Sequence, residues 1–137
     1  MSLSHTPITD AGLKELKELK QLTALDLTQT GITDAGLKDL NELKHLSALS
    51  LHYTKMTDEG LKELKELKEL TLLDLTNTQV TDAGLKHLKE LSHLSSLELW
   101  NTKVTDAGAK YLKTELPNCT IKSGTWLAGM SFFPRRP

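Results

Sequence analysis

The chain has 137 residues, enough for one domain that buries its own hydrophobic core. It carries 17 basic and 18 acidic residues, a formal net charge of -1. This balance argues against a nucleic-acid-binding protein, which normally shows a basic excess on one face.

The single cysteine and the hydropathy pattern exclude further classes. Cys119 alone can form neither an intrachain disulfide nor a cysteine-rich zinc site. The first ten residues show no signal-peptide pattern, and no apolar stretch is long enough to cross a bilayer. We therefore expect a soluble protein without a membrane partner. Its compartment stays undetermined, with the cytoplasm slightly favoured.

The segment Thr-Asp-Ala-Gly-Leu-Lys recurs along the chain at intervals of 24 residues. The leucines between the copies keep the same interval, so chance is no explanation. Such self-similarity indicates stacked structural repeats. The copies, two of which carry one substitution, begin at Thr9, Thr33, Thr57, Thr81 and Thr105.

Each unit combines a strand pattern with a helix pattern. Residues 25–27, Leu-Asp-Leu, alternate as in a strand with one buried face. Residues 32–43 instead carry leucine at helical spacing. One strand and one helix cannot bury their apolar faces alone. Stacked copies are therefore expected to form a parallel sheet, a row of helices and a continuous leucine core.

The residues at the predicted helix start have assignable roles. Thr33 is a suitable N-cap, and Asp34 suits the positive end of the helix dipole. Gly36 is a poor helix residue, yet glycine recurs at this position in every unit. This recurrence indicates that neighbouring helices approach too closely there for a side chain.

Residues 22–32, LTALDLTQTGI, resemble the strand motif of the leucine-rich-repeat family. Residues 32–37 resemble its bacterial and F-box-like subclasses, whose convex side is α-helical. The resemblance implies an α/β fold: a right-handed solenoid of about five repeats, with a parallel β-sheet on the concave side and α-helices on the convex side. It covers residues 1–121, with repeats beginning near residues 1, 22, 46, 70 and 94 and a degenerate last unit.

Threonine replaces the asparagine that the family commonly places after the strand. Stacked asparagines of the family hydrogen-bond the backbone of neighbouring turns. Because a hydroxyl can also donate and accept, we predict a threonine ladder in this role, with the methyl groups turned to the core. The threonines are Thr30, Thr54, Thr78 and Thr102.

The two ends of the chain depart from the repeat. Met1 and Leu3 fall in register with the strand leucines, so the chain as given begins inside a strand. Self-association through open solenoid ends is one expectation. Residues 122–137 form an apolar tail that is predicted to cap the core, and the alternative is a tail outside the fold. Its apolar residues are Trp126, Leu127, Met130, Phe132 and Phe133.

Outward positions of the strands form columns that vary between units far more than the core does. Such columns on a rigid, curved sheet are expected to be the binding surface. Trp100 and Tyr53 are the strongest candidate anchors, because binding energy concentrates in aromatic residues; His52 is a weaker one. The candidate binding residues are Asp26, Gln29, Ser50, His52, Tyr53, Asp74, Asn77, Glu98, Trp100 and Asn101.

Two alternatives to protein binding rest on charged residues. Asp74 and Glu98 should be neighbours about 4.8 Å apart, and two close carboxylates could bind a cation or a carbohydrate. His45 and His93 lie two units apart, too far to share one zinc ion. We expect no catalytic residues, no metal and no cofactor, because no nucleophile set, ligand cluster or phosphate-binding loop is present.

The function predicted from the sequence is protein–protein interaction through the concave sheet, without enzymatic activity. The expected partner is another protein or peptide. A basic partner is favoured by the acidic column, which consists of Asp26, Ser50, Asp74 and Glu98. The chain would be a fragment or a small member of a larger repeat family. The main alternative is a structural or consensus-like scaffold without a specific ligand, because the repeats are so alike.

Overall fold

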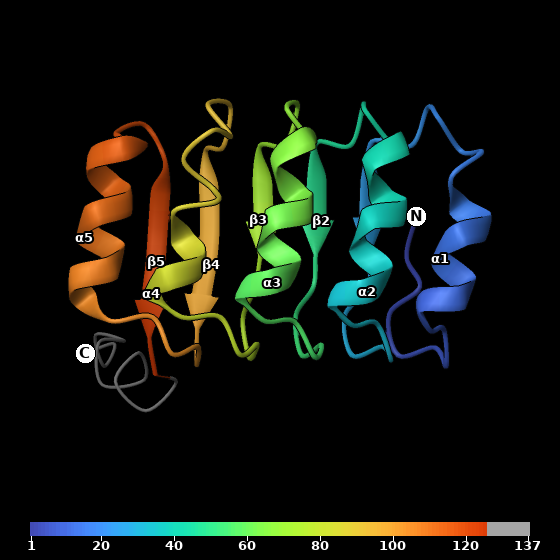
Figure 1. Cartoon of the computed structure of the whole chain (residues 1–137), viewed down its shortest axis with the longest axis horizontal. Helices are drawn as coiled ribbons and strands as arrows, with labels where there is room; N and C mark the ends of the chain where they lie inside the picture. The colour runs from blue at the N-terminus through green and yellow to red at the C-terminus, as the bar shows by residue number, and fades with distance from the viewer. Residues whose placement is uncertain (126–137) are drawn as a thin grey trace, which may run out of the picture.

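A computed structural model of the chain describes residues 1–125. Five parallel strands form one sheet in which neighbours along the chain are neighbours in space (Figure 1). Of the tail that was predicted to cap the core, residues 122–137, residues 122–124 belong to the last strand, and residues 126–137 lie outside the described residues. The strands are β1 (Ala24–Asp26), β2 (Ala48–Ser50), β3 (Leu72–Asp74), β4 (Ser96–Trp100) and β5 (Thr120–Gly124).

Equivalent residues of successive units pair across the sheet, as the 24-residue interval requires. Leu25 pairs with Leu49, and the same register continues to Ile121 in β5. Beyond β1, Ser2 forms a parallel bridge with Asp26, and Leu3 N donates to Asp26 O at 2.8 Å. The first residues therefore extend the sheet, in the register predicted for them.

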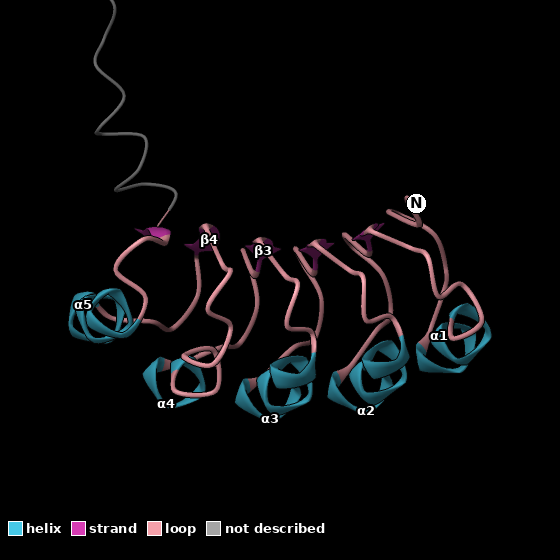
Figure 2. Cartoon of the chain, turned by 90° about the horizontal axis from the view of Figure 1, so that it is seen from above, coloured by secondary structure: helices cyan, strands magenta, loops and turns pink. Residues whose placement is uncertain are grey.

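The helices form a second layer behind the sheet. Figure 2 shows the strands on the inner side of a shallow arc and the helices on its outer side. The curvature follows from size, because strands pack about 4.8 Å apart whereas helices need about 8–10 Å. The helices are α1 (Asp10–Leu16), α2 (Asp34–Leu37), α3 (Asp58–Leu61), α4 (Asp82–Leu85) and α5 (Asp106–Glu115).

Most convex segments are shorter α-helices than the leucine spacing suggested. The α-helix α2 continues as a 3-10 helix, η1 (Lys38–Glu42), and α3 continues as η2 (Lys62–Glu66). A 3-10 turn rises more steeply per residue than an α-turn, so it spans the distance back to the next strand with few residues. All three leucines predicted for the stripe, Leu37, Leu40 and Leu43, are fully buried.

A continuous leucine core lies between the two layers. Leu27, Leu51, Leu75 and Leu99 are fully buried on the inner face of the sheet, and the helix leucines pack against them in one cluster. The chain therefore forms a right-handed solenoid of about five repeats, with a concave parallel sheet and a convex helical side.

The predicted threonine ladder between units is wrong in its partner. Thr30 Oγ1 donates to Leu27 O at 2.7 Å, within its own unit. Thr54, Thr78 and Thr102 repeat this contact three residues back. A hydroxyl on Cβ is shorter than an asparagine amide and has no second polar group, so it reaches its own turn but not the next one.

On the helical side, side-chain hydrogen bonds between units come from a carboxylate–threonine ladder. Asp10 Oδ1 accepts from Thr33 N at 2.8 Å, and Asp10 Oδ2 accepts from Thr33 Oγ1 at 2.6 Å. The same two bonds recur in three further pairs: Asp34–Thr57, Asp58–Thr81 and Asp82–Thr105. Each aspartate thus joins its own unit to the next.

The recurrent glycine makes room for this carboxylate. A Cβ added at Gly36, Gly60, Gly84 or Gly108 would lie under 3.0 Å from the aspartate of the preceding unit. The recurrence of glycine predicted a close approach of neighbouring helices there, and the structure shows that the aspartate side chain of the preceding unit occupies the space. The Thr-Asp-Ala-Gly motif therefore encodes the contact between units as well as a helix start.

Candidate functional site

Seven of the ten predicted binding residues line two separate grooves, and Gln29, His52 and Trp100 line neither. One is a groove on the strand face, and the other is a groove along the edge where the strands lead into the loops. No residue lines both grooves. Asp26, Ser50, Asp74 and Glu98 line the strand-face groove, and Tyr53, Asn77 and Asn101 line the loop-edge groove.

The strand-face groove has a volume of about 340 Å³ and is open to solvent. Its floor carries small and aliphatic side chains at the first outward position of each strand, and Leu72 is 48% exposed there. These residues form one of the outward columns predicted to make the binding surface, but none of them is among the ten candidate binding residues. The equivalent residues are Ala24, Ala48, Leu72 and Ser96.

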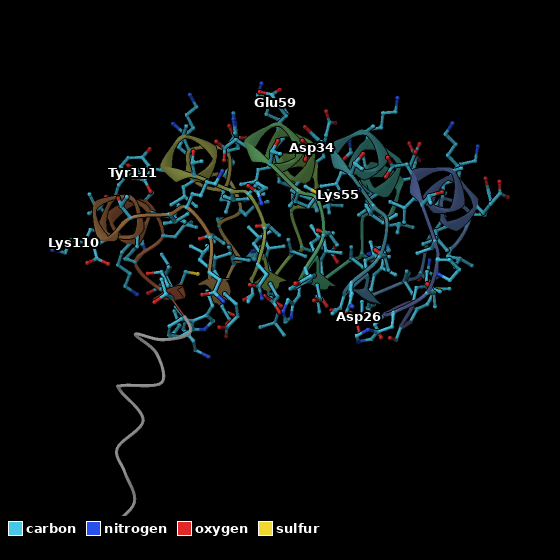
Figure 3. The ribbon with its side chains drawn as sticks, turned by 90° about the horizontal axis from the view of Figure 1, so that it is seen from below. Asp26, Asp34, Lys55, Glu59, Lys110 and Tyr111 are labelled. Atoms are coloured by element: carbon cyan, nitrogen blue, oxygen red, sulfur yellow. The ribbon has the colours of Figure 1, made fainter. Side chains whose placement is uncertain are left out.

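Two aspartates border this floor in fixed orientations. Asp26 Oδ1 accepts from Thr28 N at 2.9 Å, and Asp74 Oδ1 accepts from Thr76 N at 2.9 Å. Partial burial raises the pKa of Asp26, but hydrogen bonds from Thr28, Ser2 and Ser4 outweigh it and hold the pKa below its usual value. Asp26 is therefore ionised at neutral pH. Figure 3 shows Asp26 on the strand side of the molecule and Glu59 on the helix side.

Glu98 is not equivalent to the aspartates. Its Oε1 accepts from Lys122 Nζ at 2.8 Å, and its Oε2 accepts from Trp100 Nε1 at 2.9 Å. This contact raises the pKa of Lys122. The cation offsets the Glu98 charge, so the acidic column is strongest at Asp26 and Asp74. Lys122 was missed because the column was followed only through the four regular units, although it continues at the same interval.

Trp100 packs at the C-terminal end of the strand face. Its ring lies over Gly124, where an added Cβ would be 3.4 Å from the indole. The side chain is half-buried, so it is held in place by β5 and by Glu98. A partner would meet one side of a fixed ring.

His52 lies between the two grooves. His52 Nε2 and Asn77 Nδ2 are 3.1 Å apart, and His52 Nδ1 is 3.9 Å from Asp74 Oδ2. Because an amide nitrogen can only donate, Nε2 accepts and the proton of a neutral ring resides on Nδ1, toward Asp74. His52 thereby connects the acidic column to the loop edge.

The loop-edge groove follows a row of residues with left-handed backbone. His5, Gln29, Tyr53, Asn77 and Asn101 all have φ between 52° and 57°. Asparagine adopts this conformation readily, whereas tyrosine and glutamine do so at a cost. Tyr53 is 60% exposed. Gln29 has the same backbone but does not line the groove.

Residues 1–125 contain no convergent set of three histidine, cysteine, aspartate or glutamate side chains that could hold a metal ion. Burial raises the pKa of the Cys119 thiol, which is fully buried and protonated at neutral pH. No helix in this part of the chain has the length and apolar character required to cross a membrane.

Comparison with known proteins agrees with this architecture. A family model described as "Leucine Rich repeat" matches residues 20–40, 42–65 and 68–89. No curated protein matches the chain significantly. The repeat geometry and this match define the class: the chain belongs to the leucine-rich-repeat proteins.

Solved structures resemble the chain over most of its length. An internalin (InlF) of Listeria monocytogenes has a TM-score of 0.75 at 25% identity, covering 90% of this chain and 34% of the internalin. A leucine-rich-repeat protein of Leptospira interrogans has a TM-score of 0.71 at 30% identity, covering 89% of this chain and 30% of that protein. The chain thus spans about a third of these bacterial structures.

A third similarity concerns the fold alone. The leucine-rich-repeat ectodomain of the receptor kinase SOBIR1 from Arabidopsis thaliana has a TM-score of 0.63 at 18% identity, covering 91% of this chain and 67% of the ectodomain.

Leucine-rich-repeat domains commonly mediate protein–protein interaction and are typically binding modules rather than enzymes. A binding role is therefore the class of function that this fold supports.

Proposed function

We propose that the chain is a protein-interaction module whose strand-face groove holds an extended segment of a partner protein. The observation that carries the proposal is the groove itself. Its floor is aliphatic at Ala24, Ala48 and Leu72, and the oriented carboxylates of Asp26 and Asp74 border it. The floor supplies apolar contact area, and the carboxylates select charge.

The chemistry of the partner follows from this arrangement. Asp26 and Asp74 stand on strands two positions apart, about 10 Å at the usual strand spacing. An extended peptide advances about 3.3 Å per residue and its side chains alternate in direction. Basic side chains two or four residues apart, about 7 or 13 Å, therefore share one face and could reach both carboxylates. Aliphatic side chains of the same segment would contact the floor. The preferred partner is therefore basic and aliphatic.

Selection from a random peptide library displayed on phage tests this proposal with purified chain. We expect enrichment of peptides that combine lysine or arginine with aliphatic residues. Selected peptides should lose at least tenfold in affinity for Leu72→Lys and for Asp74→Lys, because the first places a repelling charge on the apolar floor and the second reverses a selecting charge. Raising the salt concentration should weaken binding to the native chain.

Matched controls lie on the other side of the molecule. Leu19 is 43% exposed, close to the exposure of Leu72, but follows α1. Glu66 is an exposed acid of η2. Leu19→Lys and Glu66→Lys should leave peptide affinity unchanged. Peptides that bind all four variants equally, or a selection without enrichment, would refute the proposal and favour a scaffold without a specific ligand.

A further inference from the structure

The loop-edge groove is a second concavity, separate from the proposed protein-binding face. It has a volume of about 420 Å³, larger than the strand-face groove, and shares none of its lining residues. It runs along the loops that follow β2, β3 and β4. Sites for small ligands begin at about 300 Å³, so this groove suits a ligand of one or two rings.

The charge of this groove differs from that of the strand face. Lys55 is the one charged side chain among the residues that line it, and it is exposed. No carboxylate lines the groove. On a chain with a formal net charge of -1, this groove is a local positive site, which favours an anionic group beside Lys55.

The amide side chains of the groove form an oriented chain of hydrogen bonds. Asn101 Nδ2 donates to Asn77 Oδ1 at 3.1 Å, and Asn77 Nδ2 lies 3.1 Å from His52 Nε2. Gln79 adds a further exposed amide to the lining. Amides hold both donors and acceptors, so the groove can pair with hydroxyl groups, which also do both.

Tyr53 supplies an accessible aromatic face at a conformational cost. Its φ is 57° and its side chain is 60% exposed, although asparagine occupies the equivalent position in the next two units. Bulky residues rarely adopt the left-handed conformation, and those that do concentrate at ligand sites. The nearest ring, that of His52, is tilted by 53° at 6.3 Å, so the two rings are not stacked.

We propose that the loop-edge groove binds an acidic sugar. The pyranose ring would lie on Tyr53, the hydroxyls would pair with the amides of Asn77, Asn101 and Gln79, and the carboxylate would face Lys55. One cation matches one carboxylate, whereas a nucleotide phosphate carries more charge than Lys55 alone can offset. This site shares no lining residue with the protein-binding face.

Titration of the isotope-labelled chain by NMR tests the proposal directly. The probes are the methyl glycosides of glucuronic and galacturonic acid, with the methyl glycosides of glucose and galactose as neutral counterparts. We expect an acidic glycoside to shift the amide signals of residues 53–55, 77–79 and 101 and to bind more tightly than its neutral counterpart. Lys55→Met should weaken binding tenfold or more, because it removes a charge-assisted contact.

Two control variants separate this site from general surface effects. Lys103 stands at the position of Lys55 two units later and does not line the groove. Tyr111 on α5, labelled with Lys55 in Figure 3, is an aromatic residue with 42% exposure. Tyr53→Ala should abolish the signal changes, whereas Lys103→Met and Tyr111→Ala should preserve them; the spectra themselves report whether each variant is folded.

Three results would overturn the proposal. The first is the absence of binding by either acidic glycoside. The second is equal weakening by Lys55→Met and Lys103→Met. The third is tighter binding of uridine monophosphate or of a short acidic peptide than of any acidic sugar, which would assign the groove to a different ligand class.

Discussion

One residue of every unit has a left-handed backbone conformation, and this conformation lowers stability when the residue is neither glycine nor asparagine. The conformation places a tight turn after each strand, and asparagine meets it at Asn77 and Asn101. Gln29 and Tyr53 meet it with side chains that disfavour it. The sequence contained a signal for this turn in the two asparagines, but the variation of the column obscured it, so all four residues were assigned only to binding.

Tyr53→Asn should therefore stabilise the chain. We expect the free energy of unfolding to rise by about 1 kcal/mol, the usual penalty for a bulky residue in this region, as measured by urea denaturation. Lys55→Asn, two residues later in the same loop, is the control and should give no such gain. An unchanged or lower stability of Tyr53→Asn would show that contacts of the tyrosine ring offset the backbone cost.

A single residue, His87, makes the stability of the fold depend on pH. Burial, followed by repulsion from Lys86 and Lys62, lowers the pKa of this imidazole below its usual 6.5. The unfolded chain therefore binds a proton at a higher pH than the folded chain does. Stability rises with pH where the unfolded state binds more protons, so His87 destabilises the fold as the pH falls below about 6.5.

The free energy of unfolding at two pH values tests the role of His87. Unfolding at pH 5 and pH 7.5 should show that His87→Gln loses less stability on acidification than the native chain does. His93→Gln, which removes an exposed histidine, is the comparison variant. If His87→Gln and the native chain lose the same amount, His87 does not contribute to the pH dependence.

At the scale of elements, the carboxylate–threonine ladder joins each helix start to the next. The threonine hydroxyl donates to the preceding aspartate and accepts from its own helix, as in Thr33 with Ala35 N at 3.4 Å. Thr9, which begins the first unit, has no side-chain cap hydrogen bond. This correlation indicates that the aspartate orients the threonine for capping.

Removing one aspartate tests this contact. Asp58→Ala leaves Thr81 N and Thr81 Oγ1 without their acceptors, and we expect a loss of about 2–3 kcal/mol in urea denaturation. Asp106→Ala is the control, because no threonine pairs with Asp106 within residues 1–125. It should cost about 0.5 kcal/mol, through the helix dipole alone.

Gly84 provides a double-mutant test of the same contact. Gly84→Ala should destabilise the native chain, because its Cβ would lie under 3.0 Å from the Asp58 carboxylate. In the Asp58→Ala background the same change should cost markedly less, because only Leu61 Cδ1 at 3.0 Å remains close to the added Cβ and alanine is about 1 kcal/mol better than glycine in a helix. Additive effects of the two substitutions would contradict this assignment of the glycine.

The sequence predicted regular features more completely than contacts between units. Strand order, register and buried leucines followed from the 24-residue interval, because periodicity reports which face is inward. The aspartate bridge was missed because dipole and capping arguments consider one helix at a time. The separation into two grooves was missed because a column of residues does not reveal the turn that ends each strand.

At the scale of the whole molecule, stacked units contact only their neighbours. The stability of such a solenoid approximates a sum of terms for units and for interfaces. Asp34 bridges the second and third helices, and Asp82 bridges the fourth and fifth. These two interfaces share no repeat unit, although one continuous core runs through both.

The nearest-neighbour description predicts additivity for these two bridges. Asp34→Ala and Asp82→Ala should each destabilise the chain by about 2–3 kcal/mol, and the double variant should equal their sum within about 0.5 kcal/mol. The measurement is urea denaturation of all four proteins followed by circular dichroism, with the transition slopes compared. An interaction free energy between the two substitutions well above that limit would mean that the core transmits the loss of one bridge across an intact interface. The five units would then behave as one cooperative body rather than as a chain of neighbours.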